Sequence, residues 1–305
     1  MSPRVLAAYA VVVLVWGSTW GAIKIGVAEI PPWTFALERA IAVAVILGIV
    51  SRALGLELPK DRRVLAVATL VGAINTGISW AVIFWAERFV PSGLVAVFGA
   101  TAPVWTAVLA HFAVRGDPLS ARKVFAVLLG LAGVVFLVGA SGSIEGGPAI
   151  LATILLVIVP MGWAVTSVLS ARHLTRVSPL PVIALGTAAG GVFLVPFAIA
   201  EIGQPVRWSV EAAVALAYLV LVGSCVGLVL NLWLYRRLRP TTIMLSLLLI
   251  TTEAILIGAL VLGEDLTPSM LVGAAFVIAA IALNATAGGP PRRGEVPEPA
   301  ATPAA

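Results

Sequence analysis

Long apolar segments separated by short polar breaks run through the chain to about residue 287. A helix needs about 20 largely apolar residues to cross the hydrocarbon core of a bilayer, and each segment comes close to that length. Cutting at charged, proline-rich or glycine-rich breaks predicts ten such helices. They are expected over residues 5–27, 33–54, 64–86, 92–114, 124–141, 149–170, 180–202, 211–235, 241–262 and 269–287.

Composition supports this pattern. Hydrophobic residues make up 61% of the 305 residues and charged residues only 11%, and the mean hydropathy is +1.10. A soluble domain could not tolerate such a surface. Because lipid cannot satisfy backbone amides, helices rather than open strands must cross it. The predicted fold class is all-α, a polytopic membrane protein, with residues 288–305 as a disordered cytoplasmic tail.

The basic residues predict the orientation, because cytoplasmic loops retain Lys and Arg. With the amino terminus inside, the outer loops hold only Arg88 and Arg207, and Lys24 and Arg39 lie within helices. This arrangement predicts a multi-pass protein of the cell (inner) membrane with both termini in the cytoplasm. The fifteen inner residues are Arg4, Arg52, Lys60, Arg62, Arg63, Arg115, Arg122, Lys123, Arg172, Arg176, Arg236, Arg237, Arg239, Arg292 and Arg293.

An internal repeat appears when the sequence is shifted on itself by 147 residues. The shift aligns Trp16 with Trp163 and Pro32 with Pro179, and it aligns the turns that begin at Gly116 and Gly263. The predicted repeats cover residues 1–141 and 142–287, with five helices each. Because five is odd, the second copy enters the membrane from the opposite side. Inverted repeats of this kind recur in secondary transporters, whose substrate site lies where the halves meet.

Several short motifs stand out: Trp16-Gly17-Ser18-Thr19, Ala22-Ile23-Lys24, Pro31-Pro32 with Phe35 and Arg39, and the turns Gly116-Asp117-Pro118-Leu119-Ser120 and Gly263-Glu264-Asp265-Leu266-Thr267-Pro268. Together they resemble the EamA-type transporters of the drug/metabolite transporter superfamily. The resemblance covers about residues 8 to 286. It implies a ten-helix, five-plus-five inverted-repeat carrier that commonly exports amino acids or other metabolites.

The chain departs from that family pattern at two places. Asp117 replaces the usual Glu of the first turn, and Ile250-Thr251 stands where a Glu-Pro pair is common. Glu253 lies one turn further on. These departures bear on the substrate and on the coupling chemistry rather than on the fold.

Charged residues at membrane depth are costly and therefore indicate function. Arg39 matches the family pattern, and its guanidinium can bind a carboxylate through two parallel hydrogen bonds; a structural ion pair between helices is the alternative. Glu38 is the adjacent candidate for that pair or for proton coupling. Glu253 is expected near mid-bilayer, where a carboxyl group is harder to ionise than in water. We expect it to couple proton movement to substrate movement, or else to stay protonated and bond a neighbouring helix.

Tryptophan and uncharged polar residues supply the remaining candidates. Trp16 and Trp163 occupy equivalent places in the two repeats, and central indoles offer stacking surfaces and an N–H donor to an amphipathic substrate. Packing against neighbouring helices is the competing explanation for each. The full set of predicted substrate-binding residues is Trp16, Arg39, Asn75, Ser79, Trp80, Thr101, Trp105 and Trp163, with Glu38 and Glu253 as proton-coupling candidates.

The sequence argues against several other functions. The single cysteine, Cys225, excludes a disulfide framework, and two histidines leave little material for a metal site, so we expect no metal and no cofactor. No Walker loop or His-Glu-x-x-His motif occurs, which disfavours ATP use and intramembrane catalysis. The basic residues are scattered between apolar segments and therefore predict no nucleic-acid binding. A passive pore or a lipid-handling scaffold remains the alternative to a carrier.

Within the predicted helices, three Gly-x-x-x-Gly motifs begin at Gly17, Gly186 and Gly223. Such motifs let two helices approach closely. The contact can lie within the bundle or between two copies in a homodimer, and the sequence leaves both open. The predicted partners are thus a small-molecule substrate and the lipid bilayer, with a homodimer left open.

Overall fold

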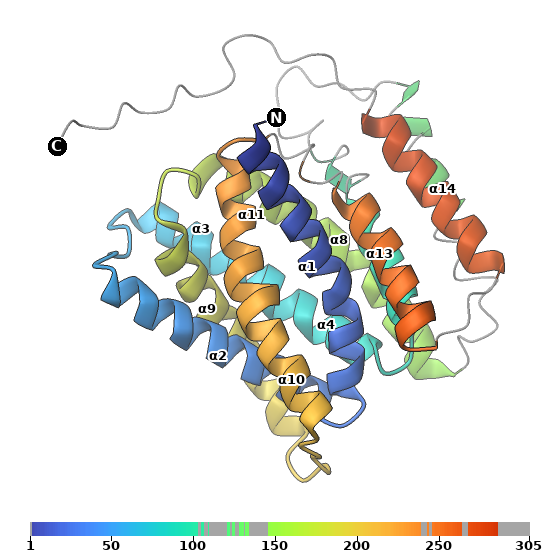
Figure 1. Cartoon of the computed structure of the whole chain (residues 1–305), viewed down its shortest axis with the longest axis horizontal. Coiled ribbons are helices and arrows are strands. Elements are labelled where there is room, and N and C mark those ends of the chain that lie inside the picture. Colours follow the sequence, from blue (N-terminus) through green and yellow to red (C-terminus); the bar gives the residue numbers. More distant parts are fainter. Residues whose placement is uncertain are drawn as a thin grey trace.

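A computed structural model describes residues 2–102, 146–238, 246–263 and 268–285, together with Ile243 and isolated positions between 105 and 133. Every regular element in these residues is a helix (Figure 1). The elements are α1 (Pro3–Val27), α2 (Pro32–Ala53), α3 (Arg62–Gly72), η1 (Ala73–Ile78), α4 (Ser79–Ala86), α5 (Ser92–Gly99), α8 (Gly147–His173), α9 (Pro179–Ala200), α10 (Val210–Tyr218), η2 (Leu219–Val226), α11 (Gly227–Tyr235), α13 (Ser246–Val261) and α14 (Pro268–Ala285).

Six of the predicted membrane helices are confirmed as helices long and apolar enough to cross a bilayer. These are α1, α2, the continuous run α3–η1–α4, α8, α9 and the run α10–η2–α11. The ninth and tenth predicted segments coincide with α13 and α14, whose described apolar stretches are shorter. The fourth segment is described over α5 and a few later residues. Most of the fifth segment, 124–141, and the tail, 288–305, lie outside the described residues.

Local sequence fixes where most of these helices begin. Proline stands at the first or second position of α1, α2, α8 and α9, where its missing N–H costs nothing and its φ is already helical. The Asp61 carboxylate accepts the Arg63 N–H to cap α3, and the Ser209 hydroxyl accepts the Ala212 N–H to cap α10.

The helices meet at two distinct ends. Near one end, Val5 of α1 packs in the same apolar cluster as Leu234 of α11, and the start of α3 packs beside the ends of α8 and α11. We call this the basic end, because Arg4, Arg62 and Arg236 lie in or beside these elements. At the opposite end, the end of α1 and the starts of α2, α5, α8 and α10 share one large apolar cluster.

Helix contacts occur in matched pairs. The long helices α2 and α9 pack side by side (Figure 1), and α5 packs against α13. In addition, α1 contacts the run α10–η2–α11, and α8 contacts the run α3–η1–α4. A shift of 147 residues places α2 on α9, α1 on α8 and the run α3–η1–α4 on the run α10–η2–α11. The α2–α9 contact therefore maps onto itself, and the contact of α1 maps onto that of α8. The shift also places η1 within η2, because residues 73–78 become 220–225.

The three Gly-x-x-x-Gly motifs all pack inside one copy of the chain. A Cβ added to Gly17 would overlap Glu253 of α13, and one added to Gly186 would lie 2.8 Å from the Ala68 carbonyl oxygen of α3. A Cβ on Gly223 would lie 3.0 Å from Thr19 of α1. The motifs therefore serve contacts within the bundle, and a homodimer would need another surface.

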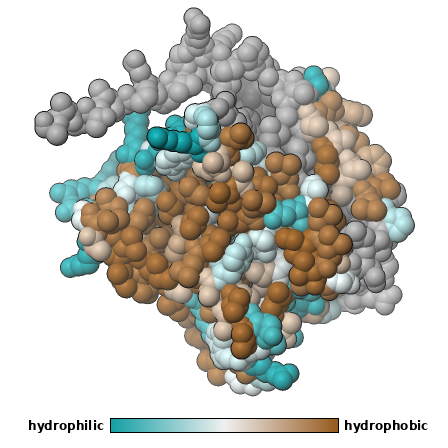
Figure 2. Space-filling model, in the orientation of Figure 1, coloured by the Kyte–Doolittle hydropathy of each residue, from teal (hydrophilic) through white to brown (hydrophobic). Residues whose placement is uncertain are grey.

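The outer surface of the bundle is strongly apolar. Leu14, Ile49, Val192 and Leu260 are between 61% and 82% exposed, and apolar side chains cover a broad area of the face shown in Figure 2. Water-soluble monomers rarely expose apolar patches of more than a few hundred Å². The surface is that of a protein whose helices face lipid.

Candidate functional site

A cavity of about 200 Å³ lies among the helices. Its wall combines residues from α1, α2, η1, α4, α8, η2, α11 and α13, so both halves of the chain contribute. One water molecule occupies about 30 Å³ in the liquid, so the volume equals about seven waters. Sites for drug-sized ligands run from about 300 to 1,000 Å³. The cavity therefore fits a small metabolite.

Four indoles dominate the cavity wall. Trp16, Trp20, Trp80 and Trp163 all line it, and the rings of Trp20 and Trp163 lie 6.5 Å apart between centroids. Indole faces bind apolar and aromatic groups, and they also attract cations. An amphipathic molecule would thus find its apolar body covered on several sides.

Two of these indoles donate hydrogen bonds to the π-helical region of the opposite half. Trp16 Nε1 donates to the Gly223 carbonyl of η2 at 3.2 Å. Trp163 Nε1 donates to Ser79 Oγ at 3.1 Å, and that hydroxyl in turn donates to the Ile74 carbonyl of η1 at 2.9 Å. The two residues matched by the 147-residue shift therefore make matching contacts.

Arg39 brings a buried positive charge to the cavity. Its side chain is only 5% exposed, and its Nε donates to Ser224 Oγ at 3.0 Å. The guanidinium carbon lies 4.1 Å from the centre of the Trp80 ring, a cation–π arrangement. Among the described residues, no carboxylate forms an ion pair with Arg39. A guanidinium has five N–H donors, so most of its donors remain available to an anion in the cavity.

The structural ion pair considered for Arg39 is therefore not found in the described part of the chain. Glu38, the adjacent residue, does not line the cavity, and its buried Oε2 has no hydrogen-bond partner among the described residues. Neighbouring positions on a helix point about 100° apart, which explains why the two side chains do not meet.

Uncharged polar groups continue the wall towards the basic end. Thr166 Oγ1 donates to Asn75 Oδ1 at 2.9 Å, and the Tyr235 hydroxyl donates to Ser167 Oγ at 2.9 Å. Asn231 also lines the cavity, and its buried Oδ1 has no partner in the described residues. These groups can bind the polar part of a ligand.

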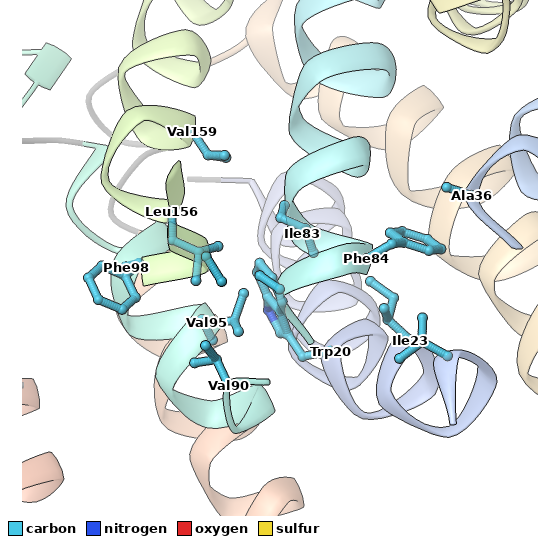
Figure 3. Close-up of a cluster of buried hydrophobic side chains, with 14 of the residues drawn as sticks. Trp20, Ile23, Ala36, Ile83, Phe84, Val90, Val95, Phe98, Leu156 and Val159 are labelled. Atoms are coloured by element: carbon cyan, nitrogen blue, oxygen red, sulfur yellow. The ribbon is translucent and has the colours of Figure 1, made fainter. Parts of the chain in front are cut away.

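The opposite end of the bundle is closed by apolar packing. Trp20 lies between Ile83 and Phe84 on one side and Val95 and Leu156 on the other (Figure 3). Beyond this cluster, Lys24 Nζ donates to the carbonyls of Glu87 at 2.5 Å and Val90 at 3.2 Å. These bonds tie the end of α1 to the turn between α4 and α5. The cavity wall instead reaches Ser170 and Ser246, which lie towards the basic end.

The predicted site residues separate into two groups. Trp16, Arg39, Asn75, Trp80 and Trp163 line the cavity. Ser79, Thr101, Trp105, Glu38 and Glu253 do not line it. Ser79 nevertheless accepts a hydrogen bond from Trp163, which does.

Glu253 packs at the α1–α13 contact rather than in the cavity. It lies against Gly17, and its Oε2 is buried with no partner in the described part of the chain. Ile250, one turn earlier in α13, lines the cavity. Thr101 instead bonds the Phe98 carbonyl at 2.8 Å within its own helix region.

Sequence reasoning missed several polar residues of the cavity region. Ser224, Ser167 and Tyr235 received no role, because hydroxyl groups in apolar helices carry no signal of which face they occupy. Among the described residues, no group of three or more His, Cys, Asp or Glu side chains could hold a metal ion.

Comparisons with known proteins identify relatives over most of the chain. The model of the EamA-like transporter family matches residues 4–139 and again 150–286. The uncharacterized transporter YoaV of Bacillus subtilis is 24% identical, covering 90% of this chain and 94% of its own length. The uncharacterized inner membrane transporter YedA of Escherichia coli strain K12 is 29% identical, covering 88% and 87%.

Two further matches complete the comparison. A protein of Streptantibioticus cattleyicolor named a probable terminal-alkyne amino-acid exporter is 27% identical, covering 89% of this chain and 90% of its own. A solved crystal structure superposes with a TM-score of 0.61 at 18% identity, covering 93% of this chain and 96% of the other. At that identity, the second match speaks for the fold alone.

Proposed function

Because the chain belongs to the EamA-like transporter family, we propose that it is a secondary active transporter that exports small carboxylate-bearing metabolites, such as amino acids, across the inner membrane. The observation that carries the proposal is Arg39, a buried cation without a described counter-ion in the wall of a tryptophan-lined cavity. A substrate carboxylate would bind Arg39, and its apolar body would contact the indoles.

Alternating access in this proposal rests on two inverted five-helix repeats, ten helices in all. Three observations support it. The family model matches the chain twice, the helix contacts exchange under the 147-residue shift, and α2 and α9 run antiparallel. The last follows because Glu201, just after α9, accepts the Thr34 N–H at 2.7 Å near the start of α2. Equivalent helices of an inverted pair must run in opposite directions.

The proposed orientation places the basic end in the cytoplasm, with both termini there. Positive residues favour the cytoplasmic side of a membrane, and Arg4, Arg62 and Arg236 lie at this end. The cavity extends towards the basic end while apolar packing closes the other. The conformation is therefore consistent with a carrier whose site is reached from the cytoplasm, which is where an exporter collects its substrate.

We assign proton coupling to Glu253 as part of the same proposal. Its carboxyl group is the charged side chain at membrane depth in α13, and the helices packed against it, α1 and α5, bring no second carboxyl. Movement of α13 against α1 would change the surroundings of this carboxyl group and so change its proton affinity. Ile250 connects the same helix to the cavity.

A passive pore is the competing function. A pore needs a continuous polar path, whereas the apolar cluster around Trp20 closes one end of the cavity (Figure 3). Counterflow in proteoliposomes separates the two functions. Unlabelled amino acid inside the vesicles should accelerate the entry of labelled amino acid from outside if the protein is a carrier. It should not do so if the protein is a pore.

Substrate recognition can be tested with purified protein. A panel of amino acids and their carboxamides is added, and thermal stabilisation is measured, because a ligand that binds only the folded state raises the apparent Tm. At least one amino acid should stabilise the protein while its amide does not. Arg39→Lys retains the charge but loses the planar fork, so it should weaken that stabilisation at least tenfold in ligand concentration. Equal effects of acid and amide would refute carboxylate recognition.

A further inference from the structure

The segments η1 and η2 are the least regular parts of the described helices, and both border the cavity. A π-helix uses i→i+5 hydrogen bonds, is rare, and is frequently found at functional sites. Asn75 of η1 and Gly223 of η2 line the cavity. Each segment lies in the middle of a membrane-length helix, so a change in its winding would swing the two ends of that helix relative to each other.

We infer that Trp16 and Trp163 are positioning residues that hold η2 and η1 in their π-helical form and so link the cavity to both segments. Each indole lines the cavity with its ring and bonds the opposite half with its N–H. Trp16 bonds the backbone of η2 directly. Trp163 acts on η1 through Ser79, because the Ser79 hydroxyl accepts from Trp163 and donates to the Ile74 carbonyl of η1.

Local packing shows that both indoles sit in spaces that only glycine leaves open. A Cβ on Gly227 would lie 2.6 Å from Trp16 Nε1, and a Cβ on Gly99 would lie 2.9 Å from the Trp163 ring. Trp20 provides the contrast: its ring lines the same cavity, but its buried Nε1 has no partner among the described residues. The two hydrogen bonds are thus specific to the matched pair.

Arg39 connects the same two regions from a third helix. Its Nε bonds Ser224 of η2, and its guanidinium carbon lies 4.1 Å from the centre of the Trp80 ring, two residues after η1. A ligand that contacts Arg39 and the indoles would therefore touch side chains that contact η2 directly and η1 through Ser79 and Trp80. This consequence for transport rests on the proposed function, whereas the mechanical link between each indole and its segment does not.

The link can be tested by thiol alkylation in membranes without any substrate. Cys225, the single cysteine of the chain, lies in η2 and is half-buried. Its rate of reaction with N-ethylmaleimide reports how often local opening of η2 exposes the thiol to the reagent. Ile78→Cys in a Cys225→Ala background provides the matched reporter in η1, because position 78 lies 147 residues before 225.

Trp16→Phe should raise the alkylation rate at Cys225 and leave the rate at position 78 unchanged. Trp163→Phe should do the reverse. The expected increase is about two- to tenfold, the factor that corresponds to the net free energy of one hydrogen bond. Trp20→Phe, the control that removes an indole N–H with no partner in the described part of the chain, should change neither rate. Ser79→Ala should reproduce Trp163→Phe, because it removes the acceptor and leaves the ring in place.

The inference is overturned if both reporters respond equally to either tryptophan substitution, if neither responds, or if Trp20→Phe has the same effect. Transport is measured separately as amino-acid counterflow. Reciprocal alkylation changes without any counterflow would support the link and contradict the transport proposal. Counterflow without reciprocal changes would do the opposite.

Discussion

Gly190 and Gly191 are adjacent in α9 but differ sharply in the space around them. A Cβ added to Gly190 would lie 2.5 Å from Thr76 Cβ, 2.7 Å from the Gly72 carbonyl oxygen and 2.8 Å from a backbone nitrogen of η1. A Cβ added to Gly191 would find its nearest neighbour, Ala40 Cβ, at 3.5 Å, an ordinary contact. Gly190→Ala therefore tests the close approach of α9 and η1, with Gly191→Ala as its control.

The expected difference follows from this geometry. To restore a contact of 3.4 Å, the Gly72 oxygen would have to retreat by 0.7 Å from its 2.7 Å position. Because it belongs to the backbone, no side-chain rotation can relieve the overlap, and overpacking of this kind costs about 1 to 3 kcal/mol. Both substitutions gain about 0.8 to 1 kcal/mol of helix propensity. That gain cancels in the comparison, so the difference isolates the packing cost.

The assay is thermal unfolding of the purified protein in detergent, followed by tryptophan fluorescence. Each kcal/mol corresponds to about 2 to 4 °C in Tm, so Gly190→Ala should unfold several degrees below Gly191→Ala. Gly191→Ala should unfold at or slightly above the unsubstituted protein. If Gly190→Ala is as stable as Gly191→Ala, then α9 and η1 lie farther apart than described, and the cavity wall beside Asn75 has a different shape.

Three further substitutions test the end of the bundle opposite the basic end and the coupling group. Lys24→Met removes the bonds that hold α1 to the α4–α5 turn. An Ile23→Cys reporter in a cysteine-free background should then react faster with an impermeant maleimide added outside. An unchanged rate would mean that Lys24 does not hold this end closed. Glu201→Gln weakens the cap of α2, because the Glu201 carboxylate accepts hydrogen bonds from the Thr34 N–H and hydroxyl. The cap should be worth about 1 kcal/mol, so Tm should fall by a few degrees. A Tm equal to that of the parent protein would show that Glu201 does not stabilise α2. Glu253→Gln should abolish proton-driven transport while leaving counterflow measurable, and a transport rate with unaltered pH dependence would remove Glu253 as the coupling group.

Sequence patterns predicted a good part of the candidate site but could not assemble it. Trp16 and Trp163 stood out because they occupy matched places in the two repeats, and Arg39 stood out because a charge in an apolar helix is costly. The structure brings all three to one cavity. It also moves Glu253 to the α1–α13 contact, where Gly17 faces it. A position near mid-membrane says how deep a side chain lies and not which way it faces.

The sequence by itself determined which segments are long apolar helices and at which end of the bundle the basic residues gather, because hydropathy, proline and charge act locally along the chain. Only the tertiary structure decided which faces meet. These helices are apolar on most sides, so their periodicity does not mark one face for the core. The contact of Arg39 with Ser224 spans 185 positions, and the two indole contacts join opposite halves of the chain. Such pairings depend on the rotation and close approach of packed helices, which no local pattern specifies.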